Sequence, residues 1–287
     1  MKFANVDGIR CEATVSGQRG VCPGCGATVV AKCGRVKVNH WAHLSGKDCD
    51  NWHEPETEWH RMWKNQFPEE WQEKDFVDEK TGEHHRADVH TPHGLTIEFQ
   101  HSSITLEECE AREKFYSSVG NLIWVVDGTR TKSLWKHFFA NRSLLFPSQR
   151  IPEDTRTCRA TEKLFPLEWL GHPVPIFFDF MGTQSREETP EERLPLVCLF
   201  PKKNVPDILI RLISRPNFIE LCKSGEIKQW ISLEYEPYVY PVSQCIKPQT
   251  HKSNSPESNI IRPKTYNING RIYTVIPGTP PRKLRRI

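Results

Sequence analysis

The sequence predicts an α/β fold built around a mixed sheet with helices on its faces. Two segments that alternate apolar and polar residues, 85–89 and 95–99, flank the turn sequence 92–94 (PHG), as adjacent strands do. A helical segment follows at 105–118. The continuous apolar run 121–127 (NLIWVVD) then has the composition of a strand buried on both faces.

The helical segments carry recognisable end signals. Thr105 is followed by acids in the first turn, as an N-cap residue is, and Gly120 ends that segment. An earlier segment, 55–67 (PETEWHRMWKNQF), is also helical in pattern, with Pro55 in its first turn. The predicted order is therefore helix, strand, strand, strand, helix, strand.

Two acids lie at matching depth on the predicted adjacent strands. Because side chains alternate along a strand, Asp88 lies on one face of its strand, and Glu98 and Gln100 share one face of the next. A hairpin about the turn brings Asp88 beside Glu98. Two close carboxylates repel each other unless a hard cation such as Mg²⁺ or Mn²⁺ bridges them. We expect a divalent-metal site here, and the alternative is a pair of solvated surface acids.

The earlier helical segment carries a polar face. Glu56, His60 and Lys64 are spaced i, i+4 and i+8, so they lie on the same side of a helix. This face either lines a site or makes ordinary surface pairs between residues one turn apart. Such pairs contribute only about 0.2–0.5 kcal/mol each.

A second metal site is predicted near the start of the chain. The knuckle at 22–25 (CPGC) is followed by further soft ligands, and residues 28–38 have the pattern of a hairpin, turned at 33–34, that returns the chain to the knuckle. A closed tetrahedral Zn²⁺ site needs four ligands and has a structural role. A redox CxxC motif is the alternative, but its usual βαβ context is absent. We favour as ligands Cys22, Cys25, His43 and Cys49, with His40 as the alternate fourth ligand and Cys33 as a less favoured candidate.

Composition places the chain among soluble intracellular proteins. It has 287 residues and ten cysteines, half of them clustered with histidines and the rest scattered, as expected for reduced thiols in the cytoplasm. No apolar run approaches the roughly 20 residues of a membrane span, and no hydrophobic segment follows the first residues. The net charge of +3 is weak evidence for a nucleic-acid partner.

The C-terminal half has clear elements but no recognisable chemistry. Residues 131–141 look helical, 172–180 and 194–200 look like strands, and 205–223 look like helical turns broken before Pro216. Strands are also expected within 230–242, a linker at 249–263 and a basic tail at 281–286. We expect an additional α+β region that contacts DNA or a protein partner.

Collinear motifs in the first half of the chain resemble a known family. The run CPGC, HWAH and Cys, then E-x3-H-x3-K, then ADV and IEFQHS, then R-x3-Y-x7-W resembles the competence protein CoiA-like family. The element order with D…ExQ resembles the PD-(D/E)XK, or restriction-endonuclease-like, nuclease superfamily, in which most members have D…ExK. The matching residues are Cys22, Cys25, His40, His43, Cys49, Glu56, His60, Lys64, Asp88, Glu98, Gln100, Ser102, Arg112, Tyr116 and Trp124.

The resemblance implies a fold, a substrate class and residue roles. It covers residues 22 to about 127, under half of the chain, and nothing after about residue 140. We divide the chain into an N-terminal strand and zinc-binding module at 1–53, a nuclease-like core at 54–142 and a C-terminal region of unknown role with a basic tail at 143–287. DNA is the implied substrate, with Asp88, Glu98 and the backbone carbonyl of Phe99 as the implied ligands of Mg²⁺ or Mn²⁺. Gln100 stands where most of the superfamily has Lys; it can orient a water but brings no charge. Lys64 or His60 can supply that missing cation if the helix face lines the site.

These observations predict a cytoplasmic, metal-dependent deoxyribonuclease that processes DNA, such as incoming or foreign DNA. One alternative is a DNA-binding or recombination accessory protein that keeps the nuclease fold without its catalysis. Another is the nuclease subunit of an anti-phage defence complex, docked through its C-terminal half. The two acids favour catalysis, whereas Gln100 and the modest charge favour an accessory role.

Overall fold

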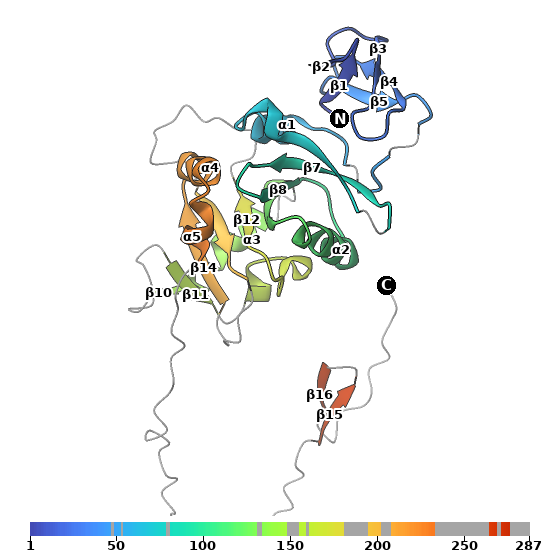
Figure 1. Ribbon diagram of the computed structural model, residues 1–287. Coiled ribbons are helices and arrows are strands. Elements are labelled where there is room, and N and C mark those ends of the chain that lie inside the picture. Colours follow the sequence, from blue (N-terminus) through green and yellow to red (C-terminus); the bar gives the residue numbers. More distant parts are fainter. Residues whose placement is uncertain are drawn as a thin grey trace, which may run out of the picture. The chain divides into compact units, whose positions relative to one another are not determined.

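A computed structural model describes the chain at residues 1–46, 49–52, 54–78, 81–130, 134–147, 155–158, 161–180, 195–201, 208–232, 264–268 and 271–275 (Figure 1). The chain divides into two compact units, Met1–Pro237 and Tyr238–Ile287. The described part of the second unit is an antiparallel pair of strands, β15 (Lys264–Ile268) and β16 (Arg271–Val275).

The first unit begins with a small antiparallel sheet in the strand order β2-β1-β3-β4-β5. Its hydrophobic core is built around Trp41, which is fully buried. The predicted hairpin at 28–38 turns later than expected, because Lys32 pairs with His40 and the connection spans residues 33–39. The strands are β1 (Phe3–Val6), β2 (Ile9–Glu12), β3 (Arg19–Val21), β4 (Thr28–Lys32) and β5 (His40–His43).

A nine-stranded mixed sheet forms the rest of the first unit, in the order β10-β11-β14-β13-β12-β9-β8-β7-β6. The inner strand β9 runs parallel to both β8 and β12, and the other pairs are antiparallel. The strands are β6 (Gln72–Val77), β7 (His84–His90), β8 (Leu95–Gln100), β9 (Asn121–Asp127), β10 (Phe146–Pro147), β11 (Thr155–Cys158), β12 (Ile176–Asp179), β13 (Leu196–Leu199) and β14 (Ile208–Ile213).

Helices cover both faces of this sheet. One hydrophobic core lies under α2 and α3, and a second lies under α1, α4 and α5. The α-helices are α1 (Glu58–Lys64), α2 (Leu106–Ser117), α3 (Leu134–Ala140), α4 (Arg215–Ser224) and α5 (Ile227–Ile231). Short 3₁₀ turns are η1 (Glu69–Trp71), η2 (Arg142–Leu144), η3 (Thr161–Lys163) and η4 (Leu167–Trp169). Within the described residues, no helix is long and apolar enough to cross a membrane.

The predicted order helix, strand, strand, strand, helix, strand is confirmed as α1, β6, β7, β8, α2 and β9. The helix starts follow from capping side chains: Thr57 accepts from the backbone N–H of His60, and Thr105 accepts from that of Glu108. The crossover through α2 returns the chain beside β8, so β8 and β9 run parallel. All six residues of β8 are buried, as expected for a central strand between two helical layers.

The strands after residue 142 continue the same sheet. The expected helix in 131–141 and strands in 172–180 and 194–200 are confirmed as α3, β12 and β13. The helical prediction for 205–223 is wrong in its first half, where β14 forms before α4. Residues 230–231, expected to begin a strand, belong to α5. The rest of the stretch to 242, the linker at 249–263 and the basic tail at 281–286 lie outside the described residues.

Candidate functional site

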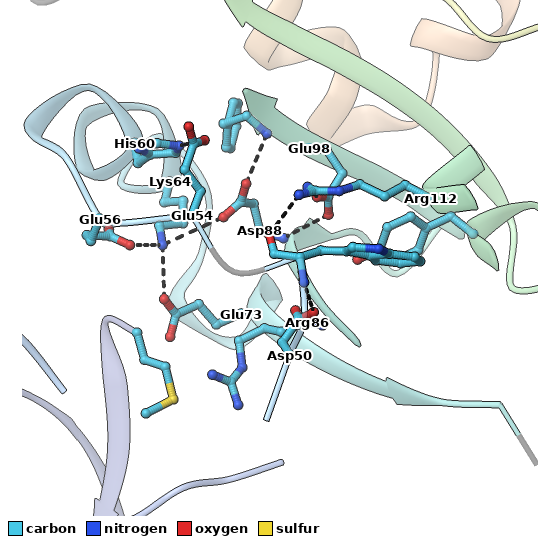
Figure 2. A pocket seen from close by; sticks show the side chains of 14 residues that line it. Asp50, Glu54, Glu56, His60, Lys64, Glu73, Arg86, Asp88, Glu98 and Arg112 are labelled. Atoms are coloured by element: carbon cyan, nitrogen blue, oxygen red, sulfur yellow. Dashed lines mark hydrogen bonds and ion pairs between the residues drawn. The ribbon is translucent and has the colours of Figure 1, made fainter. Parts of the chain in front are cut away.

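A small polar cavity opens between α1, β6, β7, β8 and the first residues of the chain (Figure 2). Its volume is about 50 Å³, which is room for a few water molecules or a hydrated ion. Six carboxylates and four cationic side chains line it. They are Asp50, Glu54, Glu56, Glu73, Asp88 and Glu98 with His60, Lys64, Arg86 and Arg112, and the other lining residues are Met1, Trp52, Phe99 and Tyr116.

The cavity lies where β7 and β8 separate. Their backbone pairing is confined to Val89 with Ile97 and His90 with Thr96. At the next residues, side-chain carboxylates take the place of the backbone hydrogen bonds between the strands. Asp88 Oδ2 accepts from the N–H of Phe99 at 3.0 Å, and Glu98 Oε1 accepts from the N–H of Asp88 at 3.3 Å. The freed backbone groups are thereby satisfied, and both carboxylates are held at the open end of the strand pair.

Burial and mutual repulsion disfavour two negative charges at this point. Burial, together with the nearby Asp88, raises the pKa of Glu98 to about 8. Burial also raises the pKa of Asp88, against the pull of Lys64 and His60. Arg112 from α2 is Glu98's cationic partner, with its Nη1 at 3.2 Å from Glu98 Oε2. A close pair of partly buried carboxylates that resists ionisation is the arrangement that a divalent cation stabilises.

Lys64 reaches the same cavity from the last turn of α1. Its ammonium lies 2.6 Å from Glu56 Oε2, 2.9 Å from Glu73 Oε1 and 3.8 Å from Asp88 Oδ1. The residue is only 1% exposed. Burial lowers the pKa of its ammonium, but the carboxylates outweigh this and raise it. Lys64 is therefore a permanently charged group beside the Asp88 carboxylate.

Glu56, predicted to share one helix face with His60 and Lys64, lies outside the helix. Glu56 precedes α1 rather than forming its first turn, and it pairs with Lys64 and Arg61 instead of His60. The alternative of weak surface pairs is wrong for Lys64, because its partners lie in a buried network.

His60 is fixed by two hydrogen bonds on the cavity wall. Its Nε2 lies 2.9 Å from Glu54 Oε2 and its Nδ1 lies 2.8 Å from Thr57 Oγ1. Burial alone would lower the pKa of His60, but Glu54 and Asp88 raise it. Burial in turn opposes ionisation of Glu54, yet His60, the Ser102 side chain and the N–H of His101 lower its pKa to about 2. Glu54 and His60 thus form a charged pair next to Lys64.

Gln100 does not share the position of Asp88 and Glu98, which line the cavity. The side chain is buried, and its Nε2 donates to the carbonyl of Ser102 at 2.9 Å. Among the described residues, the cavity lining includes Phe99 but not Gln100. The carboxamide therefore braces the connection from β8 to α2, and Lys64 is the cation that stands near Asp88.

Several cavity residues were missed in the sequence. Glu73 lies between the residues of β6 that pair with Val89 and Ala87, so it stands opposite Asp88 across the strand pair. Its φ of +48° is unusual for a residue with a side chain, and its carboxylate accepts from the N–H groups of Lys2 and Phe3. No local pattern marks such a residue, since its partners come from distant segments. For Glu54, the only hint in the sequence was its place two residues before Glu56, a predicted site residue.

The four ligands favoured for the N-terminal metal site come together. Cys22, Cys25, His43 and Cys49 offer ligand atoms that all lie within 4.8 Å of one another, and this group can hold a metal ion. Cys22 Sγ is 3.8 Å from Cys49 Sγ, and Cys25 Sγ is 3.3 Å from His43 Nε2. Two sulfurs bound about 2.3 Å from a tetrahedral ion stand about 3.8 Å apart. The alternate ligand His40 lies outside the group and donates from Nδ1 to the carbonyl of Val38.

Two residues connect this cluster to the polar cavity. Arg86 Nη2 donates to Cys22 Sγ at 3.3 Å, and its guanidinium also binds Asp75. Asp50, next to the ligand Cys49, binds the ring of His85 at 2.9 Å and the N–H of Arg86 at 2.9 Å. Arg86 and Asp50 both line the cavity. The group of Cys22, Cys25, His43 and Cys49 is therefore connected to β7, the strand that carries Asp88.

Comparison with protein families places these two sites in known domains. Residues 11–51 match the family described as Competence protein CoiA, N-terminal domain, and residues 56–154 match Competence protein CoiA, nuclease-like domain. These two segments are therefore similar to the two domains of the CoiA-like family. The nuclease-like domain implies the PD-(D/E)XK superfamily. No curated protein and no solved structure matches the chain.

The buried network predicts a large cost for removing Lys64. Lys64→Met should lower the free energy of unfolding by about 3 kcal/mol or more, because it leaves buried carboxylates without their cation. Urea unfolding of the full chain measures this. Glu58→Ala, an exposed change in the same helix, should have little effect. Equal, small losses in both variants would contradict the buried network.

Proposed function

We propose that this CoiA-like protein is a metal-dependent deoxyribonuclease with a restriction-endonuclease-like core. The observation that carries the proposal is the Asp88–Glu98 carboxylate pair at the separation of β7 and β8, with the Lys64 ammonium 3.8 Å from Asp88. The nuclease-like family match supports the same reaction class and DNA as substrate. The family's description supports a place in competence, where incoming DNA is processed.

The donor set suits a hard divalent cation. Asp88 and Glu98 offer only oxygen ligands, and the backbone carbonyl of Phe99 is a third candidate. Mg²⁺ commonly takes one or two protein carboxylates and completes its shell with water and substrate phosphate. Asp88 is 23% exposed, so a substrate can approach from its side. Bound Mg²⁺ or Mn²⁺ would supply Lewis-acid polarisation of the phosphate and a hydroxide nucleophile.

The side chains of the chain itself supply charge and position. Lys64, held by Glu56 and Glu73, places a fixed positive charge where a phosphate would gain negative charge during in-line attack. His60, whose pKa is raised by Glu54 and Asp88, can add a second cation on the same wall when protonated. Arg112 fixes the Glu98 carboxylate from α2. These groups are oriented before substrate binds, so little reorganisation is needed during the reaction.

We infer that the Cys22, Cys25, His43 and Cys49 group binds Zn²⁺ in a structural role. Three thiols and one imidazole match the ligands of closed zinc sites, and their spacing suits a tetrahedral ion. Burial raises the pKa of the Cys22 thiol, but backbone N–H groups and Arg86 outweigh this and favour the thiolate form. Donation from Arg86 to a coordinating sulfur is the type of outer contact that fixes metal ligands.

The first prediction from this proposal is loss of cleavage with retention of binding. Asp88→Asn and Glu98→Gln should abolish Mg²⁺- or Mn²⁺-dependent cleavage of single- or double-stranded DNA, because each removes a metal ligand. DNA affinity should be equal to or above that of wild type, since neither change adds negative charge near the phosphates.

Glu107→Gln is the matched control, since it removes an exposed acid from α2 outside the cavity lining. It should cleave at the wild-type rate. If wild type and Asp88→Asn behave alike on every DNA tested, with either metal and with any co-purifying partner present, the catalytic assignment is wrong. An accessory, DNA-binding role would then take its place.

The second prediction is about one Zn²⁺ per chain in protein purified without chelator. Elemental analysis measures it, and Cys22→Ser with Cys25→Ser should lose both the metal and the fold of the N-terminal sheet. Cys33→Ser is the control, because Cys33 lies outside the ligand group. Metal-free wild type, or a normally folded double variant, would contradict the zinc assignment.

A further inference from the structure

The short helix α1 carries two pairs of side chains one turn apart. His60 and Lys64 point into the cavity, and Trp59 and Trp63, each one residue earlier, are buried in the core under α1, α4 and α5. A helix of seven residues has too few internal hydrogen bonds to be stable alone. The contacts of the two tryptophans therefore decide where His60 and Lys64 stand.

Both indoles are held by one carboxylate from the C-terminal half. Asp179 Oδ2 accepts from Trp59 Nε1 at 2.9 Å and from Trp63 Nε1 at 3.1 Å. Asp179 is the last residue of β12 and is 0% exposed. Arg215, the first residue of α4, donates to both oxygens of the same carboxylate and lies over the Trp63 ring.

The contacts of Asp179 with the two tryptophans extend to β8, the strand that carries Glu98. The Trp63 ring stacks on Phe99 with centroids 5.6 Å apart, and the N–H of Phe99 donates to Asp88. Phe218 of α4 also packs edge-on against Trp63, with ring centroids 5.9 Å apart. Asp179 and Arg215 thus set the height of α1 over β8, and with it the distance from Lys64 to Asp88.

We propose that Asp179, supported by Arg215, is a positioning residue that sets Lys64 and His60 in the cavity. Neither Asp179 nor Arg215 lies in the segments that match the CoiA families, which end at residue 154. The C-terminal half therefore completes the site instead of forming an independent appendage. This inference rests on the proposed nuclease function for its kinetic consequence, but its structural consequence can be measured without catalysis.

A second buried carboxylate offers a matched control. Glu113 of α2 accepts from Trp124 Nε1 at 3.2 Å and pairs with His172 at 2.7 Å. It is also buried and also binds an indole, but it lies on the other face of the sheet, toward the core under α2 and α3. Both Glu113→Gln and Asp179→Asn should lower the stability of the protein. Only Asp179→Asn should also displace α1.

The test compares the full-length wild type with Asp179→Asn and Glu113→Gln by two readouts. The first is kcat and KM for Mg²⁺-dependent cleavage of a DNA duplex. The second is the rate at which an amine-reactive reagent labels Lys64, measured by peptide mass spectrometry relative to the exposed Lys74. Thermal unfolding of all three proteins is measured in parallel. If Asp179→Asn does not fold, Trp63→Phe replaces it, because Phe keeps the ring but removes the indole N–H.

We expect Asp179→Asn to reduce kcat by about 10-fold or more with KM within about twofold, and to label Lys64 several times faster. Glu113→Gln should keep the wild-type values of both, even at a similar loss of thermal stability. Wild-type labelling of Lys64 in Asp179→Asn would overturn the inference, as would equal changes in both variants. If the wild type cleaves no DNA, the proposed function fails, and the labelling rates alone still decide the positioning role.

Discussion

The separation of β7 from β8 beyond the Val89–Ile97 pair is the constraint on which the site depends. At that point the backbone groups of two strands lose their ladder partners, and the carboxylates of Asp88 and Glu98 take their place. Two acids are then fixed close together in a partly buried position, where their charges need a counterion. Lys64 and Arg112 meet part of that need, and a divalent cation would meet the rest.

Cations at the cavity come from elements that are distant in sequence. Lys64 comes from α1 and Arg112 from α2. Glu73, which pairs with Lys64, accepts from the N–H groups of Lys2 and Phe3 at the start of the chain. The N-terminal sheet, the helix and the large sheet therefore meet at one network of charges. Arg86 and Asp50 extend this network to the cysteine cluster. The N-terminal sheet with its cysteine–histidine group is in this way also connected to the cavity.

The sequence predicted the local parts of this arrangement well. Alternation on two strands was enough to place Asp88 beside Glu98, and the spacing of cysteines and histidines was enough to favour the four residues that come together. Burial of Lys64 was not predictable, because Glu73 and the backbone groups around it come from other segments. The run ILIRLI at 208–213 was misread, since a short apolar run does not distinguish a buried helix from a strand. The role of Asp179 was likewise hidden, because its indole donors lie more than a hundred residues earlier.

Anomalous diffraction from crystals of the full chain soaked in Mn²⁺ tests the central claim most directly. The account predicts a manganese peak in contact with the carboxylates of Asp88 and Glu98, at a distance of about 2 Å from the ligand oxygens, and a separate zinc peak at the cysteine cluster. Loss of the manganese peak, but not of the zinc peak, should follow from Asp88→Asn. A cavity without manganese at saturating concentration, or manganese bound equally well in Asp88→Asn, would contradict the account.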